Sequence, residues 1–441
     1  MQITEWRRFV EQSPAVDGRD AEELEAHLRD QVSDLTAAGL TADEAFLVAV
    51  KRMGNVHELS REFAREHSGR LWKQLVLSGG DEQEETASRW PVVMLFAVAA
   101  AVTIQVARLL SGFPLDEPDW FVRSAGLFVL PFLAGWFAWE RRLSPRQWLW
   151  TAAAFAVSAI VVNVYPFDEA SSTELLVIAH FPVLLWFVVA YPYMGGEIDS
   201  HDRRMHFVRF TGEWFIYYVL IALGGGVLIG LTAGLLEGTG VDVEAVFEWV
   251  IPSGAAGAVI VAAWLVESKQ RVIENMAPVL TMIFTPLFAV LLAVSVVVYA
   301  VTGLGEVFDR ELLGLFDALM VVVLGLVLYG MSARDPVTPP GWIDRVQLVA
   351  VVSALILDLM VLGVMVGRIG ELGFTPNRTA ALGLNLVLLV NLAGAAWLSL
   401  RFLTGKAGFH RLERWQTSYL PVFALWAAAV VVVLPPLFGF N

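Results

Sequence analysis

Cysteine is absent from this chain of 441 residues, which excludes disulfides, thiolate metal sites and a cysteine nucleophile. Charged residues are scarce at 17%, against about 25% in a typical soluble domain. Basic residues are outnumbered 30 to 44 by acidic ones, and the resulting net charge of −14 argues against nucleic acid as a partner. The sequence also lacks P-loop, HExxH and GxSxG motifs. We therefore expect no enzymatic activity, no bound metal and no cofactor.

Hydrophobic residues are abundant instead, at 57% of the chain, and they gather in long runs after about residue 90. Eleven runs are long enough to cross about 30 Å of hydrocarbon. They cover residues 90–111, 119–139, 147–165, 174–194, 212–235, 246–265, 277–302, 311–331, 346–367, 379–400 and 418–438. Backbone groups inside a bilayer must be satisfied within their own segment, and no run alternates like a membrane strand. The sequence predicts an all-α polytopic membrane protein.

The loops between these runs differ in charge. One alternate set of loops (140–146, 195–211, 266–274, 332–345 and 401–417) carries fourteen basic residues, and the other set carries only Arg310, Arg368 and Arg378. Basic loops stay in the cytoplasm, so we expect a cytoplasmic N-terminus and, after eleven crossings, an external C-terminus. Tryptophans near the ends of the runs, such as Trp90 and Trp139, are typical of the membrane interface.

Residues 1–75 are rich in charge and contain no run of membrane length, and we expect no cleavable signal peptide. Apolar spacing and caps predict a helical domain with helices over 3–13, 20–38, 41–53 and from residue 55. Thr41 and Glu44 form a predicted capping box. Residues 70–77 fit either a membrane-surface helix or the end of the last helix. Residues 76–89 are acidic and polar and are predicted to be a flexible linker to the membrane domain, 90–441.

The motifs of residues 20–67 carry a family resemblance. These motifs are Glu22-Glu-Leu-Glu-Ala-His-Leu-Arg29, Ala37-Ala-Gly-Leu-Thr-Ala-Asp-Glu-Ala-Phe46, Ala49-Val-Lys-Arg-Met-Gly-Asn55 and Glu58-Leu-Ser-Arg-Glu-Phe63. In this order they resemble the bacterial permease prefix domain, a small helical module that precedes membrane segments in several transporter-like proteins. The resemblance implies a bacterial inner-membrane location.

The membrane region does not resemble the transporters usually attached to that module. Residues 368–378 and 382–391 are instead similar to a family of uncharacterised multi-pass bacterial membrane proteins. That resemblance implies a fold and no chemistry.

Ionisable residues inside the predicted spans are the strongest functional candidates, because a charge at mid-bilayer costs roughly 2.5–3.5 kcal/mol or more. Asp358 and Asp317 are predicted to lie in the outer half of two antiparallel spans. Other polar residues at similar depth are Arg108, Arg123, Asn163, His180, Glu248, Arg310, Arg368 and Arg378. One interpretation is a shared polar pocket that binds a substrate or ion. The other is a set of structural ion pairs. The two aspartates lack the flanking motifs of intramembrane aspartyl proteases.

Several further features have two interpretations each. His180, before Pro182, fits a proton relay or a hydrogen bond to a neighbouring helix. Gly226, Gly230 and Gly234 form a small-residue face that predicts close helix packing. Gly224–Gly226, Pro278 and Pro286 indicate kinks or discontinuous helices. Asn385 and Asn391 are predicted to hydrogen-bond to adjacent helices. The residues Glu197, Asp199, His201, Asp202 and His206 include metal-ligand types, but their spacing fits a solvated loop better.

Two functional hypotheses follow. The first is a permease-like protein that transports a small solute or ion through the outer-half polar site. The second is a membrane sensor that relays an envelope signal through residues 1–75 to a cytoplasmic protein partner. The large membrane domain favours the first hypothesis, whereas the lack of a visible internal repeat weakens it. The sequence leaves homo-oligomerisation open.

Overall fold

The structure is a computed structural model of the whole chain. It describes residues 18–37, 40–53, 81–111, 120–168, 171–236, 243–268, 276–302, 310–334, 336 and 338–441. The chain divides into two compact units, Met1–Trp90 and Pro91–Asn441. Each unit is considered by itself below.

In the N-terminal unit, two described helices pack on one another: α2 (Gly18–Ala37) and α3 (Ala42–Met53). The two helices bury Leu28 of α2 and Phe46 and Val50 of α3. These parts of the predicted apolar stripes are therefore confirmed. The predicted capping box is also confirmed. The Thr41 N–H donates to Glu44 Oε2 at 2.9 Å, and the Glu44 N–H donates to Thr41 Oγ1 at 3.4 Å. The Thr41 hydroxyl, which also donates to this carboxylate, lowers the pKa of Glu44. The helices predicted over 3–13 and from residue 55, and the alternatives for 70–77, lie outside the described residues.

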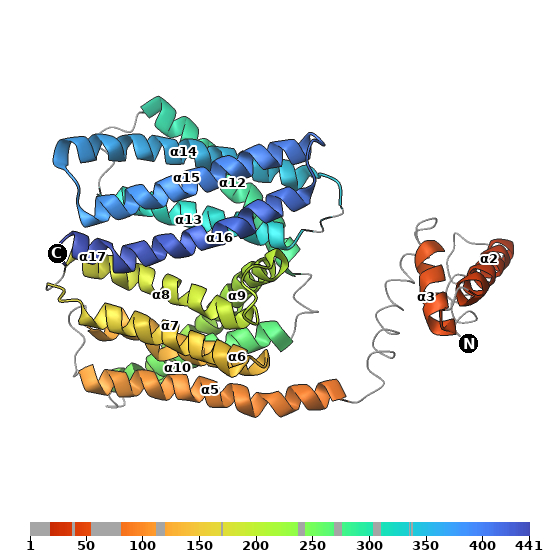
Figure 1. The fold of residues 1–441 in the computed structure, drawn as a ribbon, viewed down its shortest axis with the longest axis horizontal. Helices are drawn as coiled ribbons and strands as arrows, with labels where there is room; N and C mark the ends of the chain where they lie inside the picture. Colours follow the sequence, from red (N-terminus) through yellow and green to blue (C-terminus); the bar gives the residue numbers. More distant parts are fainter. Residues whose placement is uncertain are drawn as a thin grey trace. The chain divides into compact units, whose positions relative to one another are not determined.

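The second unit is a bundle of long helices (Figure 1). Among the described residues, eleven helices are long and apolar enough to cross a membrane, and none of these residues forms a strand. The helices are α5 (Asp81–Ser111), α6 (Trp120–Glu140), α7 (Pro145–Val164), α8 (Ser172–Tyr193), α9 (His201–Leu236), α10 (Val243–Ser268), α12 (Met276–Thr302), α13 (Arg310–Ser332), α14 (Trp342–Leu372), α15 (Pro376–Leu403) and α16 (Phe409–Val432), with a short α17 (Leu434–Leu437). The all-α polytopic fold predicted from the hydrophobic runs is therefore confirmed.

Three helices begin well before their predicted starts. α9 begins at His201 and α16 at Phe409, well before the predicted starts at 212 and 418. Both early segments contain basic residues, which lower the mean hydropathy, but each keeps a buried apolar face, as at Phe207 in α9 and Leu412 in α16. α5 begins at Asp81, so the second half of the predicted linker is helical. This start lies nine residues before the predicted one, at residue 90.

The bundle has two hydrophobic cores. The first joins α5–α10 and includes Trp136, Phe137 and Phe181, which are all almost fully buried. The second joins α12–α16 and is built around residues such as Leu357 and Leu392. α16 contacts both α15 and α8, so it links the two sets of helices, as Figure 1 shows. α9 and α12 run without interruption through Gly224–Gly226 and Pro286, so neither helix is discontinuous there.

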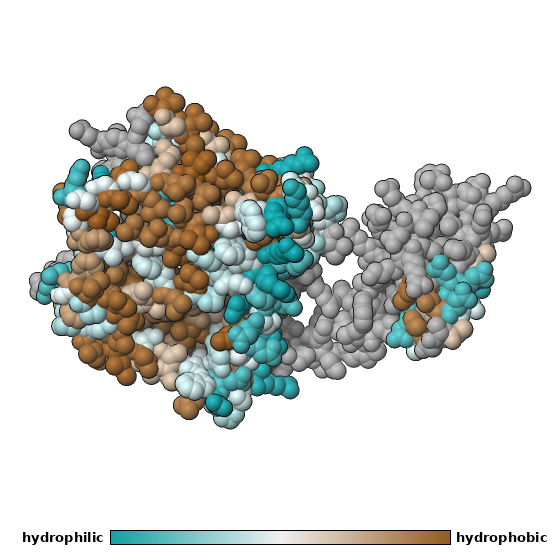
Figure 2. All heavy atoms as spheres, turned by 45° about the horizontal axis from the view of Figure 1, so that its top comes forward, coloured by the Kyte–Doolittle hydropathy of each residue, from teal (hydrophilic) through white to brown (hydrophobic). Residues whose placement is uncertain are grey.

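Apolar side chains cover the outside of this bundle. Figure 2 shows hydrophobic residues over its sides and hydrophilic residues gathered along one edge. Leu223, Val227 and Leu231 of α9 are each at least 60% exposed, as are Leu287 and Val290 of α12. Such a surface is stable only in an apolar solvent. The chain is an integral membrane protein with several spans.

The C-terminus lies against the loop between α7 and α8. The Asp168 N–H donates to the Phe440 carbonyl at 3.4 Å, and the Thr173 N–H donates to the Asn441 carbonyl at 3.0 Å. The Tyr165 hydroxyl donates to the Val432 carbonyl at 2.8 Å, and burial raises the pKa of Tyr165. This loop belongs to the acidic set, so the C-terminus shares its side of the membrane. Which side that is stays a prediction from the charges.

Two of the three predicted packing glycines, Gly226 and Gly230, face no neighbouring helix among the described residues. A methyl group at Gly226 or Gly230 would meet no atom within 4 Å, so no described helix packs on this part of the predicted small-residue face; the side-chain position at Gly234 lies outside the described residues. On α15, by contrast, a methyl group at Gly383 would overlap the Trp426 indole, and one at Gly394 would overlap that of Trp415. Gly383 and Gly394 are as far apart along α15 as Trp415 and Trp426 are along α16. The two helices are antiparallel, so each glycine meets one tryptophan. Large side chains of α16 therefore fill the gaps that glycine leaves on α15.

We expect Gly383→Ala to lower the thermal unfolding midpoint of the detergent-solubilised protein. The added methyl group forces the Trp426 ring out of its place, and overpacking of this kind costs about 1–3 kcal/mol. The matched control is Gly226→Ala, which places a methyl group in open space and raises helix propensity. Equal midpoints for the two variants would contradict this assignment of the packing glycines.

Candidate functional site

Three polar side chains of the second core lie at one depth. Asp317 on α13, Asp358 on α14 and Asn385 on α15 are each about four to five turns from the helix end that faces the basic loops. α13 and α14 are antiparallel, as are α14 and α15, so equal depth follows from their positions along each helix. The sequence predicted this depth for the two aspartates and a hydrogen bond to a neighbouring helix for Asn385.

Asn385 connects two of these helices. Its Nδ2 donates to Asp317 Oδ1 at 2.7 Å and to the Ala381 carbonyl at 2.8 Å, and Met365 Sδ of α14 lies 3.9 Å away. The side chain is 1% exposed. Both hydrogens of the amide nitrogen are therefore engaged, one by Asp317 and one by the helix backbone. The hydrogen bond predicted for Asn385 is confirmed.

Asp358 has no such partner. The residue is 1% exposed, and neither of its carboxylate oxygens has a hydrogen-bond partner among the described residues. The described residues also provide no cation for an ion pair with Asp358 or with Asp317. The buried residues that flank it along α14, Leu357, Val361 and Leu362, are apolar. The carboxylate of Asp317 is close enough to repel that of Asp358. The predicted Arg partner of this carboxylate is therefore not found among the described residues, whereas the predicted substrate or ion pocket stays a prediction.

An ionised carboxylate without donors in such surroundings is expensive. Burying a charge without compensation costs several kcal/mol, and like charges nearby add to that cost. The group must take up a proton or another cation for its charge to be removed. The Asp317–Asp358–Asn385 cluster is therefore the candidate functional site of the chain.

The other predicted site residues form separate pairs in the first core. Arg108 Nη2 of α5 contacts Glu248 Oε2 of α10 at 3.0 Å, and its guanidinium lies over Trp249. Arg123 of α6 pairs with Glu174 of α8. These two ion pairs lie on α5, α10, α6 and α8, whereas the two aspartates lie on α13 and α14. The structure therefore does not bring the predicted residues together in one pocket.

The remaining candidates have local partners or none nearby. His180 Nδ1 lies 2.9 Å from the carbonyl of Leu176 on its own helix, one turn away, so the predicted bond to a neighbouring helix is wrong. Asn163 bonds Ser124 and Ala159, and Arg378 donates to the Leu372 and Gly373 carbonyls. Arg368 is about 15 Å along α14 from Asp358, too far to pair with it. The side chain of Arg310 lies outside the described residues.

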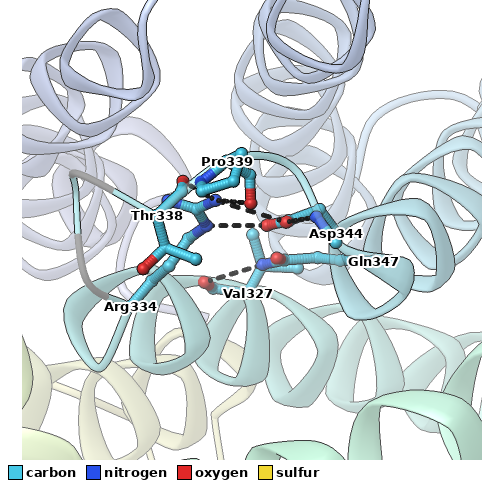
Figure 3. Close-up of polar contacts among 7 residues, drawn as sticks. Val327, Arg334, Thr338, Pro339, Asp344 and Gln347 are labelled. Carbon is cyan, nitrogen blue, oxygen red and sulfur yellow. Dashed lines mark hydrogen bonds and ion pairs between the residues drawn. The ribbon is translucent and has the colours of Figure 1, made fainter. Parts of the chain in front are cut away.

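Sequence reasoning missed one polar cluster, at the turn between α13 and α14 (Figure 3). Arg334 Nε donates to Asp344 Oδ1 at 2.8 Å, and Arg334 Nη2 donates to the Thr338 carbonyl at 2.8 Å. Nearby, Gln347 Nε2 donates to the Val327 carbonyl at 3.2 Å. Both charged residues are within 15 residues of each other in a predicted cytoplasmic loop, so a solvated loop was the simplest interpretation. The only signal was an acidic residue three positions after Gly341, at the start of a helix.

The loop before α9 contains no metal site in its described part. His201 Nδ1 is bound to Thr417 Oγ1 at 2.7 Å, and Arg204 donates to the Thr417 and Ile198 carbonyls. Across the residues that the structure describes, no group of three His, Asp or Glu side chains is arranged to hold a metal ion.

Comparison with known proteins gives no match: no family model, no curated protein and no solved structure resembles this chain significantly.

Proposed function

We propose that this integral membrane protein is permease-like and moves a small cation, alone or together with a solute, by way of the Asp317–Asp358–Asn385 cluster. The observation that carries the proposal is Asp358, a fully buried carboxylate whose oxygens have no partner among the described residues. A carboxylate kept in the membrane only for structure is expected to be paired, as Glu174 is with Arg123.

The position of the cluster also supports transport. Asp317 is half-buried, whereas Asp358 beside it is fully buried. In this order of burial, Asp317 is the carboxylate that a cation entering the bundle meets first. Transfer to Asp358 then requires a rearrangement of α13, α14 and α15, the helices that hold the cluster. The resemblance of residues 20–67 to the permease prefix domain is consistent with this proposal.

The test is cation flux in proteoliposomes that contain the full chain. A potassium gradient with valinomycin sets the membrane potential, trapped pyranine reports protons, and radioactive sodium and rubidium report the metal cations. We expect at least one cation to cross faster than in protein-free liposomes, and Asp358→Asn to abolish that flux. The matched control is Asp168→Asn, which removes an exposed carboxylate in the α7–α8 loop and is expected to leave flux unchanged.

If the folded wild-type protein moves none of these cations, the transport proposal is overturned. A sensor that acts through residues 1–75 then becomes the better hypothesis. Flux that is unchanged in Asp358→Asn would overturn the assignment of this cluster.

A further inference from the structure

The chemistry of the cluster restricts the cation that it holds. Among metal cations, Ca²⁺ takes about six to eight oxygen ligands, and the smaller Mg²⁺ needs nearly octahedral coordination. The cluster offers two carboxylates and one amide, and it is the amide nitrogen of Asn385 that faces Asp317. In the described region neither oxygen of Asp358 has a hydrogen-bond partner, and no third acidic or histidine side chain joins the two aspartates in a group that could hold a metal ion. The oxygen set is too small for a metal ion but sufficient for a proton.

The burial of Asp358 points the same way. The residue is 1% exposed, and the buried residues near it on α14, such as Leu357 and Val361, are apolar, so a metal ion bound here would have lost its hydration water. A proton needs no space of its own, because it becomes part of the carboxyl group. Two neighbouring carboxylates that share a single proton avoid the repulsion between two like charges.

We propose that the cation is a proton, bound by the carboxyl group of Asp358 with the Asp317 carboxylate as its charged neighbour. This inference rests on the proposed function, since it names the species that the cluster carries. Proton uptake forms one O–H bond on Asp358 and changes the charge of the pair from −2 to −1. The proton comes from water on the open side and returns to water on the other, and nothing is oxidised or reduced.

Asn385 decides which aspartate takes the proton. Its N–H bond to Asp317 stabilises the negative charge of that carboxylate, and its second N–H is occupied by the Ala381 carbonyl. Asp358 receives no such stabilisation. Asn385 is therefore a positioning residue that keeps Asp317 charged and leaves Asp358 to be the proton carrier.

Other charged groups on the adjoining helices lie away from Asp358. α12 carries none, α13 has Asp317 alone near this depth, and Arg401 of α15 is at the far end of its helix. Arg378 is engaged by backbone carbonyls at the α14–α15 turn. On α14 itself the ionisable residues are Asp344, Arg345, Arg368 and Glu371, all at least ten positions away. The remaining titratable groups on α12 and α13 are Tyr299, Tyr329, Arg310 and Glu311, toward the ends of their helices.

The experiment is infrared difference spectroscopy of the full chain in lipid nanodiscs, recorded between acidic and alkaline buffers. We expect a carbonyl stretch of a protonated carboxylic acid that persists above the pH at which exposed carboxyls have ionised. This band should be lost in Asp358→Asn and unchanged in Asp168→Asn. In Asn385→Leu the loss of the N–H donor should alter the titration of the band while leaving it present, which a purely structural role of Asn385 would not do.

Two outcomes overturn the inference. One is a persistent band that is identical in wild-type and Asp358→Asn protein. The other is a band that moves when sodium replaces choline at constant ionic strength, which would indicate a metal cation. The thermal midpoint of Asp358→Asn confirms folding, and a variant that fails to fold is replaced by Asp358→Glu, which should shift the band without removing it. A normal Asp358 band in a protein that moves no cation would refute the transport proposal but keep the proton site.

Discussion

Arg334→Ala is expected to lower the free energy of unfolding by about 3–5 kcal/mol, the typical cost of breaking a buried ion pair from one side. The Arg334 and Asp344 side chains are only 11% and 9% exposed. Among the described residues, removal of the guanidinium leaves the Asp344 carboxylate with one donor, the Gly341 N–H at 2.7 Å. It also removes donors to the Thr338 and Pro339 carbonyls.

The expected loss is large because one side chain holds four helices. The guanidinium carbon lies 4.7 Å from the Phe402 ring centre at the end of α15 and 4.6 Å from that of Phe409 at the start of α16. Arg334 itself follows α13, and Asp344 lies in the first turn of α14. Cation–π contacts at a partly desolvated site add to the ion pair. The cluster in Figure 3 therefore fixes the ends of the helices that carry the candidate site.

The measurement is thermal or chemical unfolding in detergent, with Arg345→Ala as the matched control. Arg345 is adjacent to Asp344 but exposed, and its removal is expected to change stability by less than about 0.5 kcal/mol. The double variant Arg334→Ala/Asp344→Ala should lose less than the sum of the single variants, because the two residues interact directly. Additive losses, or equal losses for Arg334 and Arg345, would contradict the role of this pair.

Much of the fold could be predicted from the sequence, because lipid imposes a simple rule on the backbone. A run of apolar residues that crosses a bilayer must be a helix, so eleven runs gave eleven spans. The rule fails where a helix leaves the hydrocarbon. The first turns of α9 carry Arg203 and Arg204, which hydropathy interprets as loop, whereas Phe207 and Phe210 keep one face buried. Whether one face of a helix is buried depends on which helices pack against it. The mean hydropathy of a single segment cannot predict those neighbours.

The candidate site shows the same limit. Depth along a helix is set by residue number, so the common depth of Asp317 and Asp358 could be predicted. Which helices adjoin is set by packing, and this divided the candidates: α5 pairs with α10 at Arg108 and Glu248, and α6 with α8 at Arg123. The glycines follow the same logic. Gly226 and Gly383 are both glycines on apolar helices, but only Gly383 faces a large side chain of a neighbour.

Opposite effects are expected from the removal of two buried acids, Glu174 and Asp358. The Glu174 side chain is 6% exposed and pairs with Arg123, whose side chain is 10% exposed and lies 4.9 Å from the Phe167 ring centre. Glu174→Gln leaves the Arg123 charge buried without a counter-charge. We expect a loss of about 3 kcal/mol, at the lower end for a broken buried pair because the amide oxygen still accepts a hydrogen bond.

Asp358→Asn, compared with Glu174→Gln in the same alkaline buffer, is expected to raise the unfolding midpoint, because Asp358 of the wild-type protein is ionised under these conditions. The carboxylate has no donor to lose among the described residues, and the neutral amide removes its repulsion with Asp317. A residue that costs stability and is not paired is typical of a functional site, where activity is obtained at the expense of stability. The two isosteric substitutions, measured side by side in one detergent, therefore separate a structural acid from a functional one. If both lower the midpoint by similar amounts, Asp358 is a structural residue and the candidate site loses its main support.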